Sequence, residues 1–111
     1  MKHFEVNKRN KDKLKGLLES DKPFIILYHW KECGHCIAFK PTWKKFAGKT
    51  PVQCCCIEYS MIEMMPPKLQ NVRAFPTILV IRKGNIVDNY MGDRSEDSLN
   101  KFAEKYGDKK K

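Results

Sequence analysis

The chain has 111 residues, of which 41% are hydrophobic, so it is long enough for one domain with a single core. Its formal net charge is +9, but no basic stretch is interleaved with aromatic residues in the manner of a nucleic-acid-binding motif. No apolar run approaches the roughly 20 residues that cross a bilayer. Neither a nucleic acid nor a membrane is therefore expected as a partner.

The first part of the chain predicts a short strand, a helix and a buried strand. Residues 3–6 alternate as in a strand, and Asn7 or Asn10 can cap a helix that carries three leucines on one face. The run at 23–29 is continuously apolar, which is typical of a central strand buried on both faces.

The middle of the chain predicts a second helix and a third strand. Aromatic residues recur at helical spacing from about Cys33 to Gly48, and Pro41 is expected to kink this helix. Residues 52–59 are apolar and rich in β-formers, so they predict another core strand.

The last part predicts a weak helix over residues 61–72, interrupted by two adjacent prolines, and then a hairpin over 76–92 that turns at 83–85. Ser95 is expected to cap a final helix that ends at Gly107. Early strands alternating with helices favour parallel pairing, and the hairpin adds antiparallel strands. The sequence therefore predicts an α/β fold with a mixed central sheet and helices on both faces.

The five cysteines form two groups, Cys33 with Cys36 and the run 54–56. This is not the spread pattern of a secreted disulfide framework, and it suits a reducing compartment. The spacing between the groups approaches that of a four-cysteine zinc site. However, neighbouring cysteines on a strand point to opposite faces, so no metal is expected and residues 54–56 are interpreted as small buried side chains.

Cys33 follows a buried strand and opens a helix, where free N–H groups and the helix dipole stabilise a thiolate. A thiolate is the nucleophilic form, so Cys33 is expected to be reactive near neutral pH. Cys36 lies one turn later and can resolve a mixed disulfide formed at Cys33. His35 adds a donor beside the pair. His3 and His29 are interpreted as structural.

Three motifs together resemble the thioredoxin superfamily, most closely a single catalytic (a-type) domain of protein disulfide isomerase. They are CGHC at 33–36 followed by Pro41, FPT at 75–77, and YMGDRSEDSLNKF at 90–102. The resemblance implies a thioredoxin fold, with a thioredoxin-like domain over residues 1–107 and a basic tail over 108–111.

The resemblance also implies roles for single residues. Cys33, Gly34, Cys36 and His35 form the redox motif, and Arg94 is similar to an arginine that assists proton removal from the second cysteine. Phe75 and Pro76, with a cis peptide between them, and Trp30 are expected to contact an extended substrate. No cofactor is implied. The implied partners are protein thiols or disulfides and a redox partner such as a reductase, an oxidase or the glutathione pool, with the domain acting as a monomer.

The sequence departs from the family pattern beside the pair. Glu32 stands where the family has tryptophan, and Ile37 where lysine is common, so both lower the positive potential near Cys33. Counting through one extra residue places the family's buried carboxylate at Ile26, which implies that Cys36 lacks that proton acceptor. These departures predict a reduction potential between those of thioredoxin and the isomerase, nearer the isomerase.

The predicted function is therefore a thiol–disulfide oxidoreductase or isomerase acting on protein substrates. The alternatives are a cytosolic thioredoxin-like reductant and a non-enzymatic adaptor that binds a partner through its basic face. The N-terminal residues lack the apolar run of a signal peptide, and the chain ends in GDKKK, not in an endoplasmic-reticulum retention motif. A cytoplasmic or virus-associated location is expected.

Overall fold

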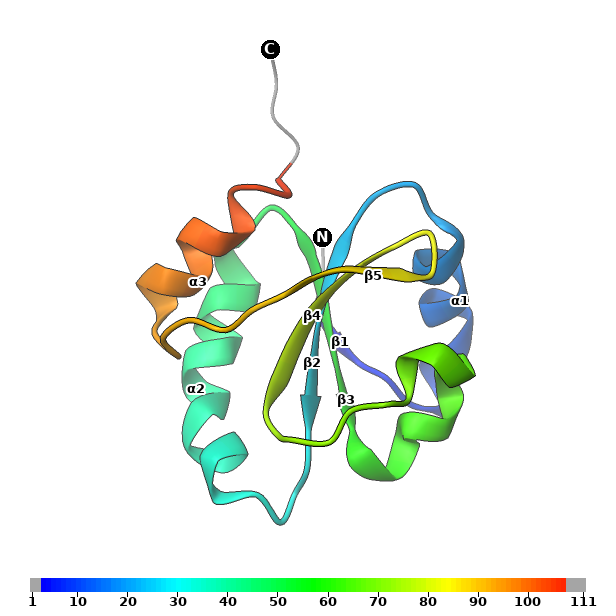
Figure 1. The fold of residues 1–111 in the computed structure, drawn as a ribbon, viewed down its shortest axis with the longest axis horizontal. Helices are drawn as coiled ribbons and strands as arrows, with labels where there is room; N and C mark the ends of the chain where they lie inside the picture. The colour runs from blue at the N-terminus through cyan, green and yellow to red at the C-terminus, as the bar shows by residue number, and fades with distance from the viewer. Residues whose placement is uncertain (1–2, 108–111) are drawn as a thin grey trace.

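A five-stranded mixed sheet forms the centre of the molecule, seen in a computed structural model that describes residues 3–107 (Figure 1). The strand order is β1-β3-β2-β4-β5; the β1–β3 and β3–β2 pairs are parallel, and the β2–β4 and β4–β5 pairs are antiparallel. The strands are β1 Phe4–Glu5, β2 Phe24–His29, β3 Gln53–Glu58, β4 Thr77–Arg82 and β5 Asn85–Asn89. The predicted mixed sheet is confirmed.

Helices cover both faces of this sheet, as predicted. The α-helices are α1 Lys11–Glu19, α2 Gly34–Lys49 and α3 Glu96–Ala103, and the short 3-10 helices are η1 Lys8–Asn10, η2 Tyr59–Met64 and η3 Pro67–Leu69. Figure 1 shows α2 and α3 on one face and α1 on the other. None of the helices in the described part of the chain is long and apolar enough to span a membrane.

Strand β2 is buried at all six positions, which confirms the central strand predicted from its continuous apolar run. Its side chains alternate between two core clusters. Ile25 and Leu27 pack with the aromatic residues of α2, whereas Ile26 and Tyr28 pack on the α1 side. This alternation fixes which residues of β2 lie beneath α2 and its first turn.

The segment 61–72, predicted as a weak helix interrupted by two prolines, is interrupted there as expected, but its helical parts are 3-10 and not α-helical. The segment forms two separate 3-10 helices, η2 and η3, and Met65 between them is extended at φ −84° and ψ 153°. Met65 precedes Pro66, and the proline ring disfavours helical geometry in the residue before it. The two prolines therefore divide the segment into two short 3-10 helices.

Two element boundaries also differ from the prediction. The hairpin turn holds only Lys83 and Gly84, both with positive φ (54° and 76°), and Asn85 already belongs to β5. Two positive φ values are typical of the tight turn that matches strand twist. Ser95 caps α3 as predicted, but α3 ends at Ala103, before Gly107. The predicted basic tail at 108–111 lies outside the described residues.

Candidate active site

Cys33 is the N-cap residue of α2. Its backbone is extended (φ −97°, ψ 113°), and its Sγ accepts a hydrogen bond of 3.3 Å from the backbone N–H of Cys36. A cap residue satisfies one of the free N–H groups that open every helix. In this case the cap atom is a sulfur, so the helix start stabilises negative charge on the thiol itself.

The two thiols of the motif have different surroundings. Cys33 is partly exposed, whereas Cys36 is 3% exposed. A hydrogen bond from the Cys36 thiol lowers the pKa of Cys33, and the backbone N–H groups of Cys36 and His35 and the charge of Arg94 act in the same direction. Burial raises the pKa of Cys36 to about 11, and its hydrogen bond to Cys33 adds to this effect. The exposed thiol is therefore the better nucleophile, and the buried one must lose its proton later.

The loop before β4 faces Cys33. The Phe75–Pro76 peptide bond is cis, and the Cys33 thiol lies 3.4 Å from the Phe75 carbonyl oxygen, to which it donates. The Thr77 hydroxyl donates to the Ala74 carbonyl at 2.6 Å and closes the turn. A backbone carbonyl is thus presented next to the nucleophilic sulfur.

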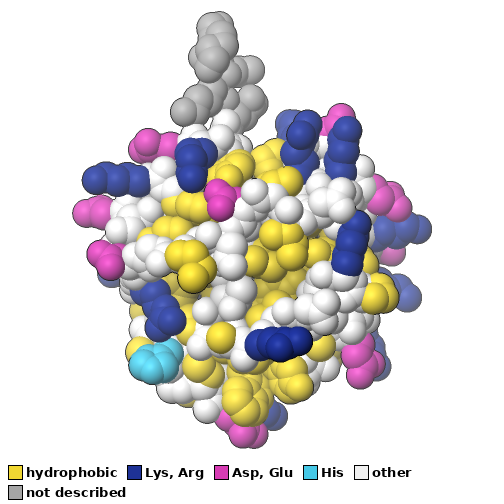
Figure 2. Space-filling model, in the orientation of Figure 1, with side chains coloured by type: hydrophobic (Ala, Val, Ile, Leu, Met, Phe, Trp, Pro, Cys, Tyr) yellow, Lys and Arg dark blue, Asp and Glu magenta, His cyan; other side chains and the backbone are white. Residues whose placement is uncertain are grey.

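An aromatic cluster lies beside this carbonyl. Trp30, Tyr59 and Phe75 are mutually in contact, with ring centroids 5.5 to 6.1 Å apart, and Trp30 and Tyr59 are 36% and 48% exposed. Figure 2 shows hydrophobic side chains gathered at the end of the molecule where β2 leads into α2. Sequence analysis named Trp30 and Phe75 but missed Tyr59. Tyr59 follows β3 as Trp30 follows β2, and parallel neighbours end at the same edge of a sheet.

The remaining predicted site residues are Gly34, His35 and Arg94. Gly34 opens α2, and a Cβ at this position would meet no atom within 4 Å, so packing does not require glycine there. His35 is exposed in the first turn, where its backbone N–H contributes to the site. Arg94 is exposed in the loop before α3, and its charge lowers the pKa of both Cys33 and Cys36.

The position assigned to the family's buried carboxylate needs correction. Ile26 packs in the core cluster on the α1 side of the sheet, so it does not lie beneath Cys36. Leu27 faces α2 instead. The reason is strand alternation: a shift of one residue moves a side chain to the opposite face. Both residues are apolar, so β2 provides no carboxylate beneath the pair.

A cavity of about 490 Å³ adjoins the pair. Its lining includes Cys36 and Ile37 from α2, Trp30 after β2, and the polar side chains of Glu5 and His29. Sequence analysis did not predict that Glu5, at the second residue of a two-residue strand, lies here. Ile37, which stands where the family often has lysine, is 62% exposed beside this cavity.

The four-cysteine zinc site considered from the sequence does not form among residues 3–107. Cys54, Cys55 and Cys56 are each at most 2% exposed inside β3, which confirms them as buried side chains. Cys54 and Cys56 face α2, and Cys55 faces α1. Within the described residues, the only group of three or more side chains placed so that they could hold a metal ion is Glu5, His29 and Cys56, which includes neither Cys33 nor Cys36.

A family model described as Thioredoxin matches residues 5–105. Protein disulfide-isomerase erp38 of Neurospora crassa is 34% identical over 104 residues, which cover 87% of this chain and 28% of that protein. Mitochondrial thioredoxin of Mus musculus is 27% identical over 90 residues, which cover 80% of this chain and 54% of the relative. The chain thus spans about a quarter to about half of the length of these two relatives.

Solved structures share the fold. The J-Trx1 fragment of ERdj5 superposes with a TM-score of 0.76 at 23% identity, covering 93% of this chain and 50% of that chain. A mutant thioredoxin from Halobacterium salinarum superposes with a TM-score of 0.75 at 19% identity, covering 99% of this chain and 95% of that chain. The predicted thioredoxin fold is confirmed.

Proposed function

Because the chain belongs to the thioredoxin family, we propose that it is a thiol–disulfide oxidoreductase that acts on protein substrates through Cys33 and Cys36. The observation that carries this proposal is the placement of the Cys33 sulfur. It caps α2, accepts the Cys36 N–H at 3.3 Å and remains partly exposed, while Cys36 is buried one turn below. One thiol can attack and the other can resolve.

The proposed reduction has two steps. The Cys33 thiolate attacks one sulfur of a substrate disulfide, the substrate S–S bond breaks, and the other substrate sulfur leaves as a thiolate that takes up a proton. The Cys36 thiol then loses its proton and attacks the Cys33 sulfur, which forms the Cys33–Cys36 disulfide and releases the second substrate thiol. Two electrons pass from the pair to the substrate. The reverse sequence oxidises a substrate dithiol.

Substrate contact is proposed at the aromatic cluster and the Phe75 carbonyl. An extended peptide lying beside Cys33 can pair with the backbone of the loop before β4, in the manner of an added strand. Trp30, Tyr59 and Phe75 offer apolar surface for its side chains, and Pro76 holds the loop in place. Arg94 is proposed to favour the thiolate form of both cysteines by its charge.

The direction of electron flow depends on the reduction potential. Typical values are about −270 mV for thioredoxin and about −180 mV for protein disulfide isomerase. We propose an intermediate value nearer the isomerase, because His35 favours the dithiol while Glu32 and Ile37 oppose it. Equilibration with glutathione buffers and mass spectrometry of the Cys33–Cys36 disulfide gives this value. A potential below that of thioredoxin overturns the proposal and supports a reductant.

Insulin reduction in the presence of dithiothreitol tests the proposed activity. The parent chain is expected to accelerate precipitation of the insulin B chain, and Cys33→Ser is expected to reduce the rate to that of dithiothreitol alone. Cys54→Ser is the matched control, because it removes a thiol far from the helix start. Equal rates for parent and Cys33→Ser would instead support a non-enzymatic adaptor. Such an adaptor would bind its partner through a basic face. In Figure 2, however, basic side chains are spread around the visible face and interspersed with acidic ones.

A further inference from the structure

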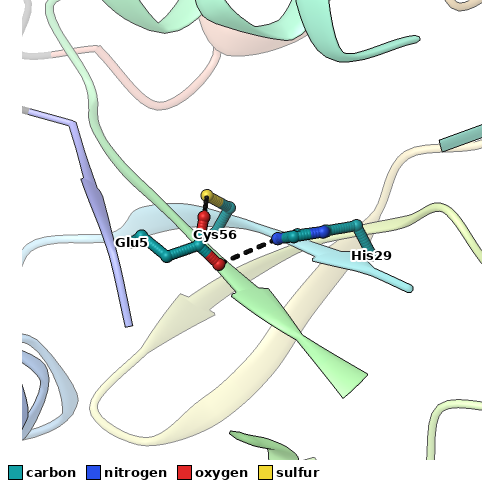
Figure 3. A group of neighbouring side chains, drawn as sticks. All are labelled: Glu5, His29 and Cys56. Carbon is teal, nitrogen blue, oxygen red and sulfur yellow. Dashed lines mark hydrogen bonds and ion pairs between the residues drawn. The ribbon is translucent and has the colours of Figure 1, made fainter. Parts of the chain in front are cut away.

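A group of polar, potentially metal-ligating side chains lies at the ends of the parallel strands, on the same face of the sheet as α2. Glu5 ends β1 and pairs directly with Cys56 of β3. Cys56 in turn pairs with Leu27 of β2, and His29 lies two residues further along the same face of β2. The sheet register therefore brings a carboxylate, an imidazole and a thiol together (Figure 3).

The donor atoms are close to one another. Glu5 Oε2 lies 2.9 Å from His29 Nε2, and Glu5 Oε1 lies 2.9 Å from Cys56 Sγ. All three donor atoms lie within 4.8 Å of one another. Ligands of one tetrahedral zinc ion, at bond lengths of about 2.0–2.3 Å, are separated by roughly 3–4 Å. A small outward movement of these side chains would place a metal ion between them.

We propose that Glu5, His29 and Cys56 form a binding site for a divalent transition metal of the zinc class. Thiolate and imidazole ligands select zinc and its neighbours in the first transition row over magnesium and calcium, which prefer oxygen ligands alone. Three protein ligands with one open position is also the arrangement in which zinc keeps an exchangeable water.

The open position faces solvent. His29 is 5% exposed and Cys56 2% exposed, so both donors are held by the core. The Glu5 side chain is 40% exposed, and Glu5 and His29 both line the cavity of about 490 Å³ beside α2. A metal ion can therefore enter past Glu5 and keep a water molecule on the cavity side, while the sheet fixes the other two ligands.

The charges and protons of the binding step balance. The metal replaces the proton of the Cys56 thiol, which leaves to solvent, and the His29 ring binds through Nε2 with its proton on Nδ1. No electron is transferred. One carboxylate and one thiolate neutralise the dication. No net positive charge is therefore added beside Lys40, which lines the same cavity. Because the metal displaces the thiol proton of Cys56, metal affinity is expected to rise with pH.

Cobalt(II) titration distinguishes a metal site from a hydrogen-bonded cluster. The chain carrying Cys33→Ser and Cys36→Ser excludes the redox pair as ligands and makes the result independent of the proposed redox function. Anaerobic titration is expected to give a thiolate-to-cobalt charge-transfer band that saturates at one equivalent and is displaced by zinc. Adding Cys56→Ser is expected to abolish the band. Adding Cys54→Ser, which removes a buried thiol from the same face of β3, is expected to retain it.

A second readout covers the case in which Cys56→Ser fails to fold. His29→Gln in the same background leaves the thiol in place. It is expected to lower cobalt affinity and to remove the zinc-dependent rise in melting temperature that the proposal predicts for the parent. Far-UV circular dichroism checks that each variant is folded. Absence of the band at equimolar cobalt, its survival in folded Cys56→Ser, or unchanged affinity in folded His29→Gln each overturns the proposal and leaves a hydrogen-bonded cluster.

Discussion

Cys33 lies at the start of α2 and reaches the surface, whereas Cys54, Cys55 and Cys56 lie inside β3 with almost no exposure. Hydrogen bonds at the helix start lower the pKa of Cys33, whereas burial raises the pKa of Cys54 to about 12 and also raises that of Cys55. The side chain is the same in both regions. The difference teaches that nucleophilic reactivity here comes from free N–H groups and solvent contact, and that Cys54 and Cys55, which lack both, act as packing groups.

The largest expected effect is on turnover. Cys36→Ser leaves Cys33 able to attack but removes the resolving thiol, so a mixed disulfide with substrate is expected to accumulate and insulin reduction to fall to the background rate. Non-reducing electrophoresis and intact mass measure the trapped species. Cys54→Ser is the control, and it is expected to form no trapped mixed disulfide. Equal trapping by the two variants would show that the two regions do not differ as described.

The next effect is an alkaline loss of stability that comes from the β3 region. The pKa of Cys54 is about 12 in the folded state against an ordinary 9.0. The contribution of the protonated Cys54 thiol to the free energy of unfolding is therefore fully present below about pH 9 and is lost as the pH rises toward about 12. Between these two pH values, each such thiol steepens the decline of the unfolding free energy by about 1.4 kcal/mol per pH unit. Urea unfolding under reducing conditions should show a shallower decline for Cys54→Ala than for the parent, and identical slopes would contradict the assignment.

Cys55→Ser separates the two regions by stability instead of activity. Cys55 is fully buried between apolar neighbours on the α1 side, so a hydroxyl at this position is expected to cost about 1–3 kcal/mol of unfolding free energy. Cys33→Ser replaces a partly exposed side chain and is expected to change the same quantity by much less. Chemical denaturation of both variants measures the contrast. A larger loss for Cys33→Ser would reverse the comparison.

The smallest effect is that of Arg94. Its guanidinium is exposed, so solvent and salt screen its action on Cys33. Arg94→Gln is expected to slow alkylation of Cys33 near neutral pH by about two- to fivefold, with most of the difference lost at high salt. Arg82→Gln, at the end of β4 opposite to Pro76, is a charge-matched control. A loss that persists at high salt would indicate direct contact instead of a screened charge.

Local patterns in the sequence predicted much of this picture. The continuous apolar run predicted β2 as a central strand, the residues around Cys33 predicted a helix start, and Ser95 predicted a cap, because each depends on neighbours within one turn or one strand. The prolines predicted the interruption that separates η2 from η3, but not that both pieces are 3-10 helices.

Features that depend on strand register could not be predicted in this way. Ile26 was placed beneath the pair by counting along the chain, but only the pairing of β2 with its neighbours shows which face it occupies. Glu5, His29 and Cys56 come from three strands, and Tyr59 joins Trp30 only because β2 and β3 are parallel. These contacts cannot be inferred from the local sequence of any one segment.

Alkylation of the reduced, folded chain as a function of pH, followed by peptide mapping, tests the central claim most directly. Cys33 is expected to react first, with a midpoint below the ordinary thiol value of 9.0, and Cys54, Cys55 and Cys56 are expected to react only on unfolding. A midpoint for Cys33 at or above that value, or modification of the β3 thiols in the folded chain at a comparable rate, would contradict the account.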